Sequence, residues 1–283
     1  MNCFFVSDLH GEVRRYEKLF LAIAEERPSA VFLGGDLTPM PFAAGDPALV
    51  DFINAFLVPE FQTLLKSLGD DYPSVFLILG NDDLRSDEAD VQAAEKLGVW
   101  HYVHRRRSKL GDHPVYGYAH VPPTPFLLKD WERYDVSRFV DPGCLSPEEG
   151  RRSVECDLRD IRYATIKEEL DELAGDDDLT DAVFLFHSPP YRTNLDRAGL
   201  DGVKVEHVPV DVNIGSIAIR RFIEERQPLI TLHGHVHESA EITGSWRDRI
   251  GRTHMFGAGH GGPELALVRF DPAAPDGATR ELL

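Results

Sequence analysis

The chain has 283 residues, 42% of them hydrophobic and 28% charged, which is a composition typical of a globular protein with a sizeable core. Its formal charge of −18 disfavours a protein that binds nucleic acid by general attraction to phosphates, because such binding needs a cationic surface. No apolar run approaches the ~20 residues that a bilayer span requires, so we expect no membrane association.

The cysteines and the start of the chain predict a cytoplasmic location. Cys3, Cys144 and Cys156 are widely spaced and form no CxxC pair, which favours reduced thiols over a disulfide framework. The chain opens on a short apolar stretch without the basic region and cleavage site of a secretory signal.

The first hundred residues repeat a pattern of apolar strand, polar tip and helix. Strands are predicted at 2–7, 30–33 and 75–79, and helices at 13–26, at 87–97, and from a proline-rich bend at 38–47 to about 68, divided by Pro59. The polar tips are Asp8-Leu9-His10, Gly34-Gly35-Asp36 and Gly80-Asn81-Asp82-Asp83. Because this pattern is typical of a parallel or mixed sheet covered by helices, we expect the tips to meet at one rim.

The remainder of the chain adds two more polar strand ends and two long connections. Strands are predicted at 99–103, 115–119, 182–186 and from 229, with further strands within 238–270, and helices at 156–173 and 215–226. The strand at 182–186 ends at His187, and the strand from 229 ends at Gly234-His235-Val236-His237. The connections 120–153 and 188–212 are too long for ordinary loops, so we expect them to lie over the site. No repeat or linker is evident, which predicts one domain over 1–283.

Seven side chains at these strand ends supply carboxylate, imidazole and amide donors. They are Asp8, His10, Asp36, Asn81, His187, His235 and His237. Singly, the aspartates could cap helices and His187 could be a hydrogen-bonded core histidine. Together, oxygen and imidazole donors suit divalent ions such as Mn, Fe or Zn, and seven donors suit two ions that share a carboxylate.

In this order the motifs resemble the calcineurin-like metallophosphoesterase superfamily, whose pattern is DxH, GD, GNH(D/E), H and GHxH. The resemblance spans residues 8–237. It implies an α/β (α+β) fold of four layers, αββα, in which a mixed β-sandwich is flanked by helices. It also implies a phosphoesterase that uses a hydroxide activated by two metals.

The resemblance assigns a role to each of the seven residues. One metal would be bound by Asp8, His10, Asp36 and His237. The second metal would be bound by Asp36, Asn81, His187 and His235. The two divalent ions could be Mn, Fe, Zn or a mixed pair.

One residue departs from the family pattern, because Asp82 stands where the family has a histidine after Gly-Asn. Cations nearby would keep the Asp82 carboxyl ionised and make it a poor proton donor. The sequence therefore favours diesters or activated leaving groups, or a donor borrowed from the 188–212 connection, such as His207. Asp82 and His207 are the catalytic candidates.

The function predicted from the sequence is hydrolysis of a small phosphorylated substrate, with a phosphodiester of a small molecule or nucleotide favoured. A nuclease of the same superfamily is one alternative, against which the charge argues. A non-catalytic scaffold that keeps the fold is another, against which the complete set of donors argues. The sequence leaves the oligomeric state open.

Overall fold

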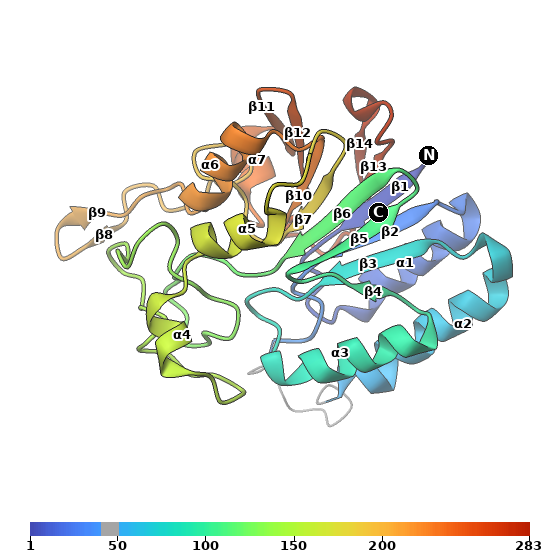
Figure 1. The fold of residues 1–283 in the computed structure, drawn as a ribbon, viewed down its shortest axis with the longest axis horizontal. Helices are drawn as coiled ribbons and strands as arrows, with labels where there is room; N and C mark the ends of the chain where they lie inside the picture. The colour runs from blue at the N-terminus through green and yellow to red at the C-terminus, as the bar shows by residue number, and fades with distance from the viewer. Residues whose placement is uncertain (41–50) are drawn as a thin grey trace.

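The computed structural model describes residues 1–40 and 51–283, so most of the predicted bend at 38–47 lies outside the described residues. The described strands include two six-stranded mixed sheets, which pack face to face with helices on their outer sides (Figure 1). This arrangement confirms the predicted sandwich flanked by helices. No described helix is long and apolar enough to cross a membrane.

The first sheet has the order β14-β13-β1-β2-β3-β4. Its strands are β1 (Cys3–Val6), β2 (Ala30–Gly34), β3 (Ser74–Ile78), β4 (His101–Tyr102), β13 (Ala266–Phe270) and β14 (Thr279–Leu282). Strands β1 to β4 run parallel, and β13 pairs antiparallel with β1. The three tips predicted from the first hundred residues therefore end at the same edge of this sheet.

The second sheet has the order β11-β12-β10-β7-β6-β5. Its strands are β5 (Arg106–Leu110), β6 (His113–Tyr118), β7 (Val183–Phe186), β10 (Ile230–His233), β11 (Arg247–Ile250) and β12 (Thr253–Gly257). Strands β6, β7, β10 and β12 are parallel, and the outer strands β5 and β11 are antiparallel to their neighbours.

Alternating side chains explain why the second sheet is buried on both faces. Val183 and Leu185 of β7 belong to the core that the two sheets share, whereas Phe184 and Phe186 pack against helices on the outer face. Those helices are α5 (Ile166–Ala174) and α6 (Ile217–Arg226). The helices on the other side of the sandwich are α1 (Val13–Glu26), α2 (Val58–Leu68) and α3 (Glu88–Ala94).

Two helix predictions need correction or refinement. The helix predicted at 156–173 is wrong as a single element, because it divides into α4 (Leu158–Tyr163) and α5. Ala164 is extended between them, and the Thr165 side chain accepts the Glu168 N–H and so starts a new helix. Pro59 stands at the start of α2, after a π-helical stretch Ile53–Leu57, which confirms the predicted division.

The 106–110 region forms the edge strand β5, which the sequence analysis did not predict. The side chains of Arg105, Arg106 and Arg107 pair with acidic groups, among them Glu169, Glu95 and Asp177. The predicted strand at 99–103 is shorter than expected, with only His101–Tyr102 paired. The charged edge suits a strand that has no outer neighbour among the described residues.

The connection 120–153 has a buried centre that contains an ion pair. Lys129 Nζ lies 2.6 Å from Glu132 Oε2, and neither side chain is more than 1% exposed. Trp131 and Tyr134 are buried in the same segment. The stretch 129–134 therefore packs inward as part of the folded structure.

The connection 188–212 contains a short hairpin that extends from the rest of the molecule (Figure 1). Its strands are β8 (Lys204–Val205) and β9 (Val208–Pro209). Glu206 and His207 form the turn with positive φ angles, and His207 is exposed there.

Candidate metal centre

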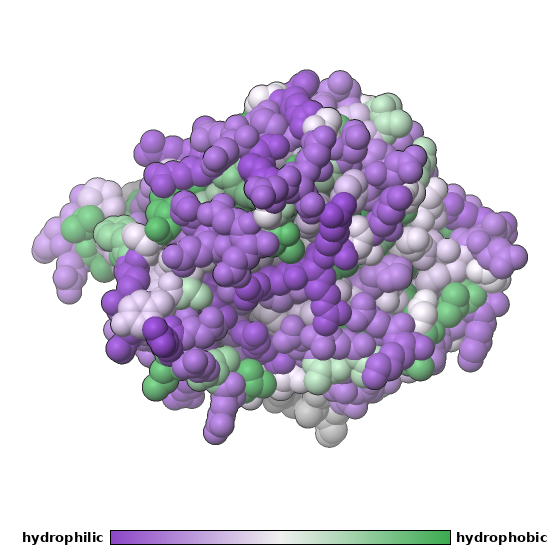
Figure 2. Space-filling view, viewed as in Figure 1, coloured by the Kyte–Doolittle hydropathy of each residue, from purple (hydrophilic) through white to green (hydrophobic). Residues whose placement is uncertain are grey.

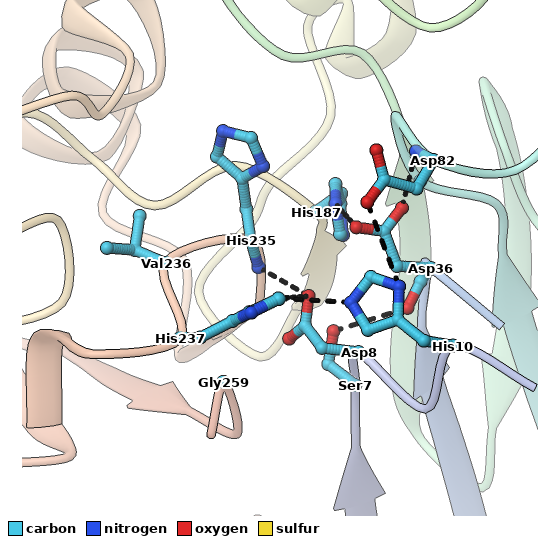
Figure 3. A network of polar contacts seen from close by, with 12 residues as sticks. Ser7, Asp8, His10, Asp36, Asp82, His187, His235, Val236, His237 and Gly259 are labelled. Carbon is cyan, nitrogen blue, oxygen red and sulfur yellow. Dashed lines mark hydrogen bonds and ion pairs between the residues drawn. The ribbon is translucent and has the colours of Figure 1, made fainter. Parts of the chain in front are cut away.

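The ends of five strands from the two sheets meet and bring the seven predicted side chains to one place. Figure 3 labels all of them except Asn81. Contacts between side chains and backbone groups join the sheets at this point. His187 Nδ1 lies 2.8 Å from the Gly34 carbonyl oxygen, and the His235 N–H donates to Asp8 Oδ1 over 2.9 Å. The tips of β1, β2, β3, β7 and β10 therefore form one continuous rim.

Four of the seven residues form a compact donor group. One ligand atom from each of Asp8, His10, Asp36 and His237 lies within 4.8 Å of the others. The Nε2 atoms of His10 and His237 are 3.1 Å apart, and His237 Nε2 is 3.4 Å from Asp8 Oδ1. These are the four residues that the resemblance assigns to one metal.

Unpartnered atoms in this group fit a bound cation. Within the described ranges, Asp8 Oδ2 and His10 Nδ1 are buried and have no hydrogen-bond partner. Buried polar atoms are nearly always paired, so two such atoms within one donor group need an explanation. Carboxylate and imidazole donors are the ligands that divalent transition metals take, so the residues present fit the implied ion.

The other predicted donors gather on the opposite side of Asp36. His187 Nε2 lies 3.2 Å from Asp36 Oδ2 and 3.0 Å from Asn81 Oδ1. Since Nδ1 of His187 faces the Gly34 carbonyl, a proton on Nδ1 leaves Nε2 free to bind a cation. The His235 ring lies edge-on to His187, with centroids 5.3 Å apart. Asp36 is thus the residue that both groups share.

The backbone at this rim adopts positive φ angles, which residues other than glycine rarely adopt. Asp8, His10, Asp36 and His235 all have positive φ angles. Such angles are uncommon outside glycine, although aspartate and histidine tolerate them best, and they cluster at functional sites. Asp8 and Asp36 are buried and His10 and His235 are half-buried, so the surrounding structure holds these conformations.

Two glycines make room for the donors, because a Cβ at either position would overlap them. A Cβ on Gly80 would lie 2.7 Å from His187 Cε1 and would also overlap Asp36 Oδ1. A Cβ on Gly234 would lie 2.7 Å from Asp8 Oδ2 and would overlap Ser7 Oγ. Any larger residue at either position would displace a predicted ligand.

Two residues support the site without having been predicted to do so. The buried Asp83 carboxylate accepts the N–H groups of Leu37, Thr38 and Gly80, and so ties the tips of β2 and β3 together. Arg15 donates to the carbonyl oxygens of Asp8 and Gly262. Asp83 directly follows Asn81-Asp82, so its supporting role could have been predicted from the sequence. Arg15 lies on a helix, and no sequence motif around it indicates its role.

The charges of the site are strongly coupled. Burial alone would raise the pKa of Asp8, but the hydrogen bond and charge of His237 hold it well below its usual value. Burial would lower the pKa of His187, but Asp36 raises it to about 10. Burial, reinforced by the charge of His187, lowers the pKa of His235 to about 3 and keeps its imidazole neutral. The carboxylates are therefore ionised and available to a cation.

Asp82 lies at the site, and His207 does not join it. The Asp82 N–H donates to Asp36 Oδ1 over 2.8 Å, and its Oδ2 is 3.7 Å from His10 Nδ1. Burial and then the charge of Asp36 raise the pKa of Asp82 to about 6, and divalent cations nearby would act in the opposite direction. His207 remains at the exposed turn between β8 and β9.

Comparison with known proteins agrees with this geometry. The family model described as calcineurin-like phosphoesterase matches residues 1–239. No curated protein matches the chain in sequence. The solved structure of TT1561 from Thermus thermophilus aligns with a TM-score of 0.59 at 17% identity, covering 99% of this chain and 98% of that one. A dimetal phosphatase from Danio rerio aligns with a TM-score of 0.50 at 12% identity, covering 95% of each chain. At these identities the structures show a shared fold.

Proposed function

The chain belongs to the calcineurin-like phosphoesterase family, and we propose that it is a hydrolase that uses two divalent metal ions to cleave phosphate esters. The observation that carries this proposal is the convergence of Asp8, His10, Asp36 and His237, with two of their buried atoms unpartnered within the described structure.

The proposed ligand sets share Asp36. Asp8, His10, Asp36 and His237 would hold one ion, and Asp36, Asn81, His187 and His235 would hold the other. Divalent ions of the Mn, Fe or Zn type would supply a nucleophile near neutral pH and positive charge to oppose that of phosphate.

The role of the protein is to hold these donors ready. The Gly34 carbonyl orients His187, the Asp82 N–H orients Asp36, and the His235 N–H orients Asp8. Such outer contacts fix the direction in which a ligand presents its lone pair. A site held in this way needs little reorganisation when a phosphate ester binds.

The aspartate at position 82 indicates which kinds of phosphate ester the enzyme favours. A histidine at this position could protonate a departing alkoxide, whereas an aspartate that stays ionised beside cations could not. We therefore infer that phosphodiesters of a small molecule or nucleotide, or esters with activated leaving groups, are favoured. The charge of −18 supports a small substrate over a nucleic acid.

The test is hydrolysis of bis-p-nitrophenyl phosphate and p-nitrophenyl phosphate with added Mn²⁺ and with chelator. We expect metal-dependent cleavage that favours the diester and that Asp36→Asn abolishes. Asp70→Asn is the matched control, because Asp70 is an exposed aspartate outside the set of donors. A wild-type protein that binds metal fully and cleaves neither ester would support the scaffold alternative, and one that binds no metal would overturn the proposal.

A further inference from the structure

A groove beside α4 carries an excess of positive charge in a protein that is otherwise strongly acidic. Its volume is about 770 Å³, within the range of small-molecule sites. Three arginines line it, Arg152, Arg159 and Arg162, against a single acidic residue, Glu148. The groove shares no residue with the seven donors of the metal centre.

Glu148 does not neutralise all of this positive charge, because its carboxylate already accepts hydrogen bonds from other groups. Its carboxylate accepts from Arg162 Nε over 2.7 Å, from Arg138 Nη2 over 2.7 Å and from the Tyr134 hydroxyl over 2.9 Å. In residues 1–40 and 51–283, neither Arg152 nor Arg159 has a carboxylate within ion-pair distance. Two cationic side chains of the groove therefore remain without a counter-charge there.

Arg152 has an unused hydrogen-bonding edge. Its Nε and Nη2 atoms are buried and have no acceptor in the described part of the chain. These two atoms lie on the same edge of the guanidinium, the fork that binds two oxygens of a phosphate or carboxylate in parallel. Burial lowers the pKa of Arg152, yet an arginine remains charged in a protein. Both atoms are shielded from solvent, so an oxyanion in the groove reaches them only when the Arg152 side chain turns outward, and it then satisfies both donors and the charge.

The walls of the groove also present apolar surface. Ile161 is buried at the groove, while Leu158 and Tyr163 on α4 are 79% and 58% exposed. Figure 2 shows hydrophilic and hydrophobic surface side by side in the region where Figure 1 places α4. Cationic and apolar groups next to each other fit a ligand that has both an anionic and an organic part.

The groove is joined to the segment that follows Asn81 and Asp82. Ser153, next to Arg152, accepts the Ser86 N–H through its hydroxyl over 2.9 Å. The Asp130 carboxylate accepts the N–H groups of both Arg85 and Ser153. These contacts fix the backbone next to Arg152.

We propose that this groove binds a small organic molecule carrying a phosphate dianion, toward which the Arg152 side chain turns to donate two hydrogen bonds through its Nε–Nη2 edge, while Arg159 adds charge. A dianion matches the excess of two positive charges among the lining side chains. This binding is independent of the hydrolysis proposed for the metal centre.

The probe is phenylphosphonate, which carries an aromatic ring and a dianionic head and has no ester bond to cleave. Titration calorimetry of the full-length protein at pH 8 compares the wild type with Arg152→Gln, Arg152→Lys and Arg159→Gln. Arg151→Gln is the matched control, because Arg151 is the exposed neighbour and does not line the groove. Each variant is also checked for an unchanged thermal unfolding midpoint.

We expect the groove to bind one equivalent of phenylphosphonate. Arg152→Gln should lower the affinity for this equivalent by at least about tenfold, while Arg151→Gln binds as the wild type does. Arg152→Lys should also bind more weakly than the wild type, because an ammonium lacks the planar fork. Asp36→Asn should retain this equivalent, which separates it from any phosphonate bound at the metal centre. Benzoate, a monoanionic carboxylate of similar size, should bind more weakly than phenylphosphonate. The proposal is overturned if Arg152→Gln binds as the wild type does, or if Asp36→Asn removes all binding.

Discussion

His10 and His237 bring their Nε2 atoms to within 3.1 Å of each other, although 227 positions separate them in the chain. Two imidazole nitrogens at this distance share at most one proton between them, and Asp8 Oδ1 lies 3.4 Å from the same atom of His237. The pair connects the first motif of the chain to the last. It is therefore a sensitive point at which to test the site.

Removing His10 should weaken metal binding. His10→Ala deletes one of the four convergent donors, and we expect affinity for Mn²⁺ to fall by more than about tenfold. The measurement is metal content after dialysis against defined free Mn²⁺, with His101→Ala as the control because His101 is exposed. Equal metal content in His10→Ala and the wild type would remove His10 from the ligand set.

Adding a methyl group at Gly80 should disrupt the centre from the side of Asp36. The new Cβ of Gly80→Ala would lie 2.7 Å from His187 Cε1, so the shared donors must move. We expect loss of hydrolysis and destabilisation by about 1–3 kcal/mol in urea unfolding. Gly277→Ala is the matched control, because a Cβ there meets nothing within 4 Å. An active, metal-loaded Gly80→Ala protein would contradict this geometry.

Introducing a histidine at position 82 should change how the rate of hydrolysis depends on the leaving group. In Asp82→His, a proton donor stands beside Asp36, so we expect turnover of phenyl phosphate to rise by at least about tenfold relative to p-nitrophenyl phosphate. Asp82→Asn removes the charge without adding a donor and serves as the control. If Asp82→His leaves the ratio unchanged at full metal content, the explanation of substrate preference by leaving group fails.

Replacing His207 should have no effect on catalysis. His207 is exposed at the turn between β8 and β9, in a hairpin that extends from the rest of the molecule (Figure 1). We expect His207→Ala to keep kcat and the pH profile on bis-p-nitrophenyl phosphate. A selective loss on substrates with poor leaving groups would instead restore His207 as a proton donor.

Mild acid should destabilise the fold through buried histidines. Burial lowers the pKa of His120 to about 4, despite the nearby Glu169 carboxylate, so the folded state keeps this imidazole neutral. The unfolded chain takes up a proton near pH 6.5, so stability is lost as pH falls from about 6.5 towards 4. For His120 alone this loss amounts to roughly 3 kcal/mol.

Urea unfolding of the wild type and His120→Gln between pH 4.5 and 8 tests this expectation. The variant should show a shallower decline in its free energy of unfolding, by up to about 1.4 kcal/mol per pH unit. His101→Gln, at an exposed histidine, should decline as the wild type does. Parallel curves for all three proteins would show that His120 does not govern acid stability.

Much of the candidate site could be predicted because each donor directly follows an apolar strand. Asp8, Asp36 and His187 come at or just after the ends of β1, β2 and β7, and the carboxyl ends of parallel strands share an edge. The break between α4 and α5 was not predicted. There the cap at Thr165 prevailed over an apolar pattern that continued through it.

The sequence by itself determined the donor types, their order along the chain and the strands followed by helices, because these follow from local periodicity and residue chemistry. The mixed sandwich flanked by helices was implied by the family resemblance. Only the tertiary structure decided that the rims of the two sheets coincide. The contact between His187 and the Gly34 carbonyl spans 153 positions, and Asp36 and His235 reach their places through positive φ angles. Packing between the sheets imposes both features. The groove at Arg152 likewise exists only because α4 folds back beside a segment whose own sequence shows no binding pattern.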